Sequence, residues 1–175
     1  MGCKARDGAE TTGEPGPDDR EHDDRRWMRE ALAEALRAER LGEVPVGAVV
    51  VQDRQIIARG FNRREIDGDP LAHAEIIAIR QAAKIVGDWR LTGCTIYVTL
   101  EPCAMCAGAL VNSRLDALVY ATADPKTGFC GSLGSLVQEP RLNHQVEVRS
   151  GVLEVECAQL LRGFFRRLRR TPEGL

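Results

Sequence analysis

The sequence predicts an α/β protein, a three-layer α/β/α sandwich around a five-stranded mixed sheet. Short apolar runs typical of buried strands alternate with segments whose apolar residues recur at helical spacing. The expected order is α-β-β-α-β-α-β-β-α, and 175 residues suffice for one ordinary domain with its own core. Strand–helix–strand units favour parallel pairing, so we expect a largely parallel sheet with helices on both faces.

An acidic tail precedes this domain. Residues 1–23 are rich in Gly, Pro, Asp and Glu and lack apolar periodicity, which predicts disorder. The domain should then cover residues 24–175. Its first helix is expected over residues 24–41, where apolar residues recur at helical spacing and Gly42 suits the end of the helix.

A hairpin and a second helix come next. The runs VGAVVVQ (46–52) and QIIARGF (55–61) predict two antiparallel strands across the short turn Asp53-Arg54. Residues 71–86 then show helical periodicity, with a glycine directly after them.

The rest of the chain repeats the alternation of strand and helix. CTIYVTL (94–100) reads as a buried strand, and a short helix is expected over residues 104–111. ALVYAT (117–122) and QVEVR (145–149) predict two further strands. A long helix over residues 152–170 carries its apolar side chains on one side.

Composition limits the class of protein. No apolar run approaches the ~18–20 residues that cross a bilayer, and the N-terminus lacks the apolar core of a secretory signal. We therefore expect a cytoplasmic protein without a membrane partner. The formal net charge is −2, but five arginines crowd into residues 162–170. Such a basic segment permits a polyanionic partner without requiring one.

Two thiols lie three positions apart in TLEPCAMCAGAL (99–110). Pro102 suits a helix N-terminus, so Cys103 and Cys106 should lie on the first helical turn, where the helix dipole favours the thiolate. Such a pair can bind a metal, form a redox couple, or simply fill space in a core. The spacing brings both sulfurs to one side, as tetrahedral zinc requires.

A histidine and a glutamate decide between these interpretations. His73 lies near the start of the helix that precedes the strand leading to the cysteines, so its side chain can reach them at the same sheet edge. His73, Cys103 and Cys106 leave a fourth metal position open, which is the catalytic arrangement. Glu75, two residues from His73, could take a proton from metal-bound water and carry it to a leaving nitrogen.

These residues resemble a known family. His-Ala-Glu (73–75) and Pro-Cys-Ala-Met-Cys (102–106) match the H-x-E…P-C-x-x-C motif of zinc nucleoside and nucleobase deaminases. From about Trp27 to Arg170, VPVGAVVV, GFNR, DPLAHAEI, DPKTGFCGSL and NHQVEV resemble the bacterial tRNA-specific adenosine deaminases. The resemblance implies a cytidine deaminase-like fold, one Zn²⁺ per subunit and a homodimer. It also implies hydrolytic conversion of adenosine to inosine at the wobble position of a tRNA anticodon, of the tRNA-Arg type.

The resemblance also implies the roles of single residues. His73, Cys103 and Cys106 would hold zinc, and Glu75 would be the catalytic proton shuttle. The remaining residues would bind the substrate: Asn62 at the nucleoside, Val46 in the pocket wall, Asp124 and Lys126 near the flanking anticodon nucleotides, and Arg90 and Arg114 at phosphates. Taken alone, these six also suit ordinary turn, core and surface positions.

Other functions stay open at this point. A deaminase of a free nucleobase or nucleotide, such as cytosine, guanine or dCMP, would use the same fold and chemistry. A zinc protein that binds RNA without catalysis would not explain Glu75, because a structural site needs no proton shuttle. A redox pair of cysteines would explain neither Glu75 nor His73. We expect a tRNA anticodon stem-loop as the partner, since its splayed bases can enter a deep pocket, and no DNA.

Overall fold

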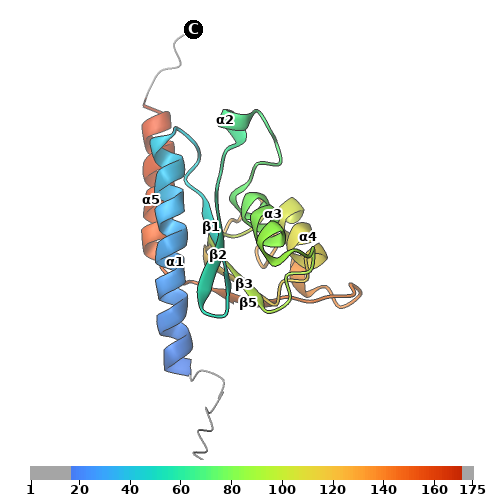
Figure 1. Ribbon diagram of the computed structural model, residues 1–175. Coiled ribbons are helices and arrows are strands. Elements are labelled where there is room, and N and C mark those ends of the chain that lie inside the picture. The colour runs from blue at the N-terminus through green and yellow to red at the C-terminus, as the bar shows by residue number, and fades with distance from the viewer. Residues whose placement is uncertain (1–16, 171–175) are drawn as a thin grey trace, which may run out of the picture.

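The computed structural model describes residues 17–170, in which a five-stranded sheet lies between two layers of helices (Figure 1). The strands are β1 (Gly47–Gln52), β2 (Gln55–Phe61), β3 (Cys94–Leu100), β4 (Ala117–Thr122) and β5 (Glu147–Ser150). The helices are α1 (Pro17–Arg40), α2 (Arg64–Asp67), α3 (Ala74–Val86), α4 (Ala104–Asn112) and α5 (Glu154–Leu168), with a 3-10 turn at Leu136–Gln138. The predicted α/β/α sandwich is confirmed.

The sheet is mixed, with the strand order β2-β1-β3-β4-β5. β1 runs antiparallel to both of its neighbours, whereas β3, β4 and β5 are parallel to one another. The expected hairpin is confirmed, and its turn residues Asp53 and Arg54 have φ values of 49° and 58°, as a tight type I′ turn requires. The expectation of a largely parallel sheet holds only for β3 to β5.

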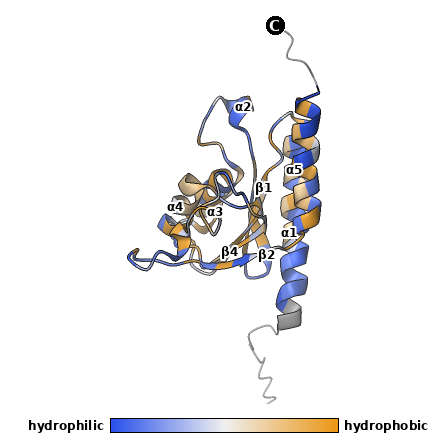
Figure 2. Ribbon diagram, turned by 180° about the vertical axis from the view of Figure 1, so that it is seen from behind, coloured by the Kyte–Doolittle hydropathy of each residue, from blue (hydrophilic) through white to orange (hydrophobic). Residues whose placement is uncertain are grey.

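Alternating side chains divide the core between the two faces of the sheet. Val49 and Val51 of β1 pack with α1 and α5, whereas Ala48 and Val50 pack with α3 and α4. Figure 1 shows α1 and α5 side by side on one face, and Figure 2 shows that the α3 and α4 layer is the more hydrophobic. Within residues 17–170 no helix combines the length and apolar character of a bilayer crossing.

Two glycines let helices lie directly on strand backbones. A Cβ on Gly47 would lie 2.2 Å from the carbonyl oxygen of Ala31 in α1. A Cβ on Gly60 would lie 2.3 Å from the carbonyl oxygen of Ala74, the first residue of α3. Gly60 therefore fixes the start of α3 against β2, and with it the position of the residue before α3.

The N-terminal boundary differs from the prediction. α1 begins at Pro17 and not at residue 24, so residues 17–23 are helical and do not belong to a disordered tail. A proline is favoured at the first position of a helix, which agrees with this earlier start. The predicted disorder of residues 1–16 lies outside the described residues.

Smaller differences concern other elements, and the bounds of β1, α4, β5 and α5 differ from the predicted ones by one or two residues. α3 begins at Ala74 and not at residue 71, because the preceding residues form a turn in which the backbone N–H of Leu71 donates to the Asp69 carboxylate at 2.8 Å. The short helix α2 and the 3-10 turn were not predicted, because neither carries a recurring apolar face.

Candidate metal centre and substrate cavity

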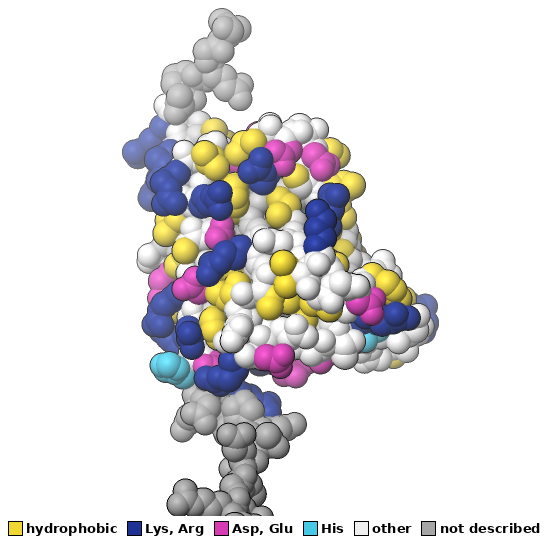
Figure 3. All heavy atoms as spheres, in the orientation of Figure 1, with side chains coloured by type: hydrophobic (Ala, Val, Ile, Leu, Met, Phe, Trp, Pro, Cys, Tyr) yellow, Lys and Arg dark blue, Asp and Glu magenta, His cyan; other side chains and the backbone are white. Residues whose placement is uncertain are grey.

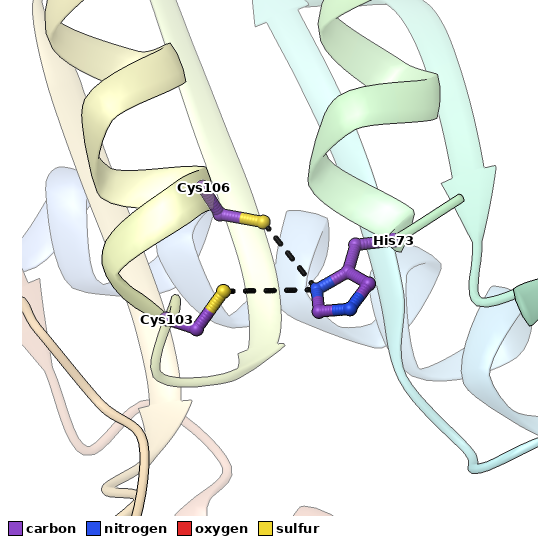
Figure 4. Close-up of side chains that lie close together, drawn as sticks. All are labelled: His73, Cys103 and Cys106. Carbon is purple, nitrogen blue, oxygen red and sulfur yellow. Dashed lines mark hydrogen bonds between the residues drawn. The ribbon is translucent and has the colours of Figure 1, made fainter. Parts of the chain in front are cut away.

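The direction of the strands brings two helix N-termini together. β2 and β3 run the same way, because each is antiparallel to β1, so their carboxyl ends lie at one edge of the sheet. α3 begins after β2 and α4 after β3, with His73 and Cys103 as the residues before their first turns. Figure 4 shows His73 at the start of α3 facing Cys103 and Cys106 at the start of α4.

The three side chains have the spacing of a metal site. Nδ1 of His73 lies 3.8 Å from Sγ of Cys103 and 3.6 Å from Sγ of Cys106. The three potential ligand atoms all lie within 4.8 Å of one another. A tetrahedral zinc ion separates a nitrogen and a sulfur ligand by roughly 3.5 Å, given its usual bond lengths. The residues therefore fit zinc, and that they bind it stays a prediction.

The pKa values of the two thiols are shifted in opposite directions. A hydrogen bond from Cys106, followed by one from His73, outweighs burial and lowers the pKa of Cys103 to about 4. The same pairing with Cys103, together with burial, raises the pKa of Cys106. The hydrogen bond to Cys103 also raises the pKa of His73. A lowered pKa favours the thiolate of Cys103, the form that binds metals.

Glu75 lies in the first turn of α3 and is only 4% exposed. Burial is the largest cause that raises its pKa, and the charge of His73 opposes this effect. The carboxyl group lines the same cavity as His73 and Cys103. A buried carboxyl group with a raised pKa can hold a proton and release it, as a general acid–base catalyst must.

A cavity of about 760 Å³ opens over this cluster. Four of the six predicted substrate residues line it: Val46, Asn62, Asp124 and Lys126. The other two are not among its lining residues. The guanidinium of Arg90 stacks 4.1 Å from the ring centre of Trp89, and that of Arg114 donates to Oδ1 of Asn143 at 2.7 Å.

One wall of the cavity comes from α5 and from Arg169, the residue directly after it. This wall consists of Leu161, Arg162, Phe165, Arg166 and Arg169. Lys and Arg side chains gather at the upper left of Figure 3, over the end of the molecule where α5 ends. The arginine-rich segment noted in the sequence therefore borders the candidate site, and Arg64 of α2 adds a further positive charge to its lining.

Glu101, which precedes Pro102, is a buried residue that no sequence motif indicated, and it is 2% exposed. Its carboxylate accepts backbone N–H groups of Asp124 (2.9 Å), Cys130 (3.0 Å) and Ser132 (2.9 Å), and the Ser132 hydroxyl also donates to it. A Cβ on Gly128 would lie 2.3 Å from the Glu101 carboxyl carbon. Glu101 thus holds the loop that carries two predicted substrate residues.

Glu43 is a second residue that the sequence analysis missed. It lies between α1 and β1 and is 1% exposed, and its carboxylate accepts a hydrogen bond from Nδ2 of Asn62 at 2.9 Å. The only local signal for either glutamate is a charged residue beside an apolar strand, which by itself does not reveal a buried partner.

Comparison with known proteins assigns the family. Residues 22–169 match the family model of the MafB19-like deaminases. The tRNA-specific adenosine deaminase of Bacillus subtilis (strain 168) is 54% identical over 151 residues, which cover 86% of this chain and 94% of that protein. The enzyme of the same name from Haemophilus influenzae is 50% identical over 86% of this chain and 87% of that protein.

Solved structures agree with this assignment. A structure from studies of A-to-I editing by tRNA:A34 deaminases at the wobble position of transfer RNA has a TM-score of 0.75 and 44% identity, covering 78% of this chain and 99% of that chain. The protein NE0047 in complex with 2,6-diaminopurine has a TM-score of 0.70 and 25% identity, covering 87% of this chain and 84% of that chain. The fold is therefore that of the cytidine deaminase-like proteins, and the chain belongs to the family of the tRNA-specific adenosine deaminases.

Proposed function

We propose that the protein hydrolyses adenosine to inosine at the wobble position of a tRNA anticodon, of the tRNA-Arg type. The observation that carries the proposal is a single cavity that holds Glu75, His73 and Cys103 and is bordered by arginines of α5. The names of the relatives support both the reaction and the RNA substrate.

The chain's own residues would supply binding and proton transfer. His73, Cys103 and Cys106 would hold one Zn²⁺ per subunit, and zinc when bound supplies Lewis-acid activation of the attacking water. Glu75 accepts a proton from this water and passes it to the adenine amino nitrogen. The oxygen adds at C6, the C6–N6 bond breaks, and the products are inosine and ammonia.

The wall of the cavity suits an RNA loop. Arg162, Arg166 and Arg169 recur on one side of α5 and would contact phosphates. Asp124 and Lys126 on the opposing loop would lie near the nucleotides that flank the target. Arg90 and Arg114, outside the cavity lining, would contact phosphates farther along the stem-loop.

We also propose that the protein acts as a homodimer in the cytoplasm and does not use DNA. The resemblance to the family supports the dimer. Ile85 and Trp89 near the end of α3 are 64% and 51% exposed, and a second copy would cover such apolar side chains.

The test is inosine formation in an arginine tRNA anticodon stem-loop, compared with free cytidine and free guanine. We expect inosine only at the wobble position, lost in Glu75→Ala and retained in Glu156→Ala, an exposed glutamate of α5. Reaction on a free base or nucleoside without reaction on RNA would support the nucleobase or nucleotide deaminase instead. Zinc binding without any reaction would favour a non-catalytic RNA-binding protein.

A further inference from the structure

We propose that Glu43 is a positioning residue that turns the Asn62 side chain so that its amide oxygen faces the substrate. This inference deepens the proposed function and rests on it for the identity of the substrate. The two residues come from separate loops, Glu43 from the loop after α1 and Asn62 from the loop after β2.

The Glu43 carboxylate is buried and holds two donors. Oε2 accepts the hydrogen bond from Nδ2 of Asn62 at 2.9 Å, and Oε1 accepts the backbone N–H of Ile66 in α2 at 2.8 Å. The backbone of Glu43 is itself held, because its N–H donates to the carbonyl oxygen of Ala38 at 3.0 Å. Because both carboxylate oxygens and the backbone N–H of Glu43 form hydrogen bonds, the carboxylate is an acceptor in a fixed position.

This acceptor decides which way the Asn62 amide points. A carboxylate only accepts hydrogen bonds, so the NH₂ group of Asn62 must face Glu43, since the flipped amide would set two acceptor oxygens against each other. The backbone of Asn62 is also fixed, because its N–H donates to the carbonyl oxygen of Val46 at 2.9 Å. Oδ1 therefore points away from Glu43.

The free side of the amide opens onto the cavity. Asn62 lines the cavity although it is only 6% exposed. Within residues 17–170 no donor forms a hydrogen bond with its Oδ1. Oε2 of Glu34 is the sole fully buried side-chain nitrogen or oxygen atom in that range without a hydrogen-bond partner, so Oδ1 of Asn62 is not sealed inside the protein. Oδ1 of Asn62 is thus an oriented acceptor at the cavity wall, and it suits a hydrogen-bond donor of the substrate.

An adenosine presents two kinds of donor, its amino group and its ribose hydroxyls. Either kind of donor can pair with the oxygen of Asn62, so the proposal is the same for both. A site that pairs with such a donor binds its substrate less selectively when the acceptor is replaced by a second donor, because both donors are then left unpaired.

Replacing Glu43 by glutamine should reverse the orientation of the Asn62 side-chain amide. In Glu43→Gln the new side chain still accepts the Ile66 N–H through its oxygen and then presents its NH₂ to Asn62. Asn62 must turn its oxygen towards position 43 and its NH₂ towards the cavity. We expect kcat/KM on the stem-loop to fall about 10-fold to 100-fold, as for a lost buried hydrogen bond. Glu34→Gln, which alters a buried glutamate of α1 that pairs with Arg59, is the matched control.

A reciprocal exchange separates positioning from folding. Asn62→Asp alone sets two carboxylates together and should also lower activity. In the double variant the glutamine donates to the aspartate, whose second oxygen restores an acceptor at the cavity. We expect the double variant to regain at least about 10-fold in kcat/KM over Glu43→Gln. A double variant no more active than either single variant overturns the proposal.

Substrate variants identify the donor. With 2′-deoxyadenosine at the target position, the cost of Glu43→Gln disappears if the ribose 2′-hydroxyl is the donor and persists in full if the amino group is. Both results agree with an oriented acceptor. If Glu43→Gln reacts as fast as the wild type on both substrates, the oriented acceptor is contradicted.

A readout without turnover keeps this proposal distinct from the proposed function. Solvent exchange of the Asn62 side-chain amide protons, followed by NMR, should accelerate in Glu43→Gln, because the NH₂ then faces the cavity, and stay unchanged in Glu34→Gln. Faster exchange in a protein that deaminates no RNA would uphold the positioning role and reject the proposed substrate. Unchanged exchange in Glu43→Gln rejects the positioning role.

Discussion

The Glu101 carboxylate accepts a hydrogen bond from the backbone N–H of Asp124 at 2.9 Å. Glu101 lies two residues before Cys103, and Asp124 begins the loop whose side chains line one side of the cavity. One buried carboxylate therefore joins the turn of the candidate metal centre to the loop that would meet the substrate.

Glu101→Gln should destabilise this loop and the whole domain. All groups that surround the carboxylate are donors, so the NH₂ group of glutamine would face a donor and leave buried polar atoms unpaired. We expect the free energy of unfolding in urea to fall by about 1–3 kcal/mol. The control is Glu147→Gln, whose carboxylate is 60% exposed and pairs with Arg149, and which should change stability by less than about 1 kcal/mol.

The stabilisation by Glu101 should depend on pH. Burial raises the pKa of this carboxyl, but the hydrogen bonds from Ser132 and from backbone N–H groups together outweigh burial and place the pKa below its ordinary 4.5. A lowered pKa stabilises the fold above the unfolded-state value, and this contribution is lost as the pH falls through the folded-state value. The stability gap between the wild type and Glu101→Gln should be full at about pH 7 and shrink below about pH 4.5. A gap that widens in acid contradicts this account.

Gly47→Ala should be among the most damaging small substitutions. The added Cβ would meet backbone atoms of α1, which cannot move away as a flexible side chain can. We expect a loss of about 3 kcal/mol or failure to fold, measured by thermal or urea unfolding. Gly108→Ala in α4 is the matched control, since its Cβ would meet nothing nearer than 3.9 Å, and alanine there should stabilise by about 0.5–1 kcal/mol.

Removal of one sulfur ligand should abolish metal binding. Cys103→Ser replaces a thiolate by a hydroxyl group that stays protonated, so the zinc content after dialysis should fall from about one ion per chain to almost none. Mass spectrometry of the metal content gives the answer directly. Cys157→Ser, in a buried position on α5 outside the cluster, should keep its zinc, and equal loss from both variants would argue against the assigned ligands.

The α5 arginines should determine the salt dependence of RNA binding. In the double variant Arg162→Ala/Arg166→Ala, the slope of log K against log salt concentration should decrease by about 0.7 for each lost contact with a single-stranded phosphate. Fluorescence anisotropy of a labelled stem-loop measures this slope. Arg80→Ala changes an exposed arginine of α3 that does not line the cavity and should leave the slope as it is.

Local patterns predicted the strands well and the short helical pieces poorly. β2, β3 and β4 have the predicted bounds, because their apolar runs are also the buried runs of the sheet. The helix α2 has no buried residue, so no periodicity could reveal it. It is tied instead through the N–H of Ile66 to Glu43, a contact over 23 residues of chain.

In the candidate site, too, some residues could be predicted from local patterns and others could not. His73, Glu75 and the two cysteines could be predicted because their chemistry demands specific residue types at specific spacings. Glu43 and Glu101 could not, because their partners lie 19 to 31 residues away and are chosen only when the chain folds. Arg90 and Arg114 matched family positions, yet local stacking and hydrogen bonds place their side chains away from the cavity lining.

The position of α5 in the chain sets an order of events during synthesis. Every other residue that lines the cavity precedes α5, and the last lining arginine is Arg169. Translation runs from the N-terminus at about 5–20 residues per second, so the histidine, the cysteines and Glu75 leave the ribosome before the basic wall does. A nascent chain would thus contain the proposed metal ligands and proton shuttle before it contains the helix proposed to contact RNA.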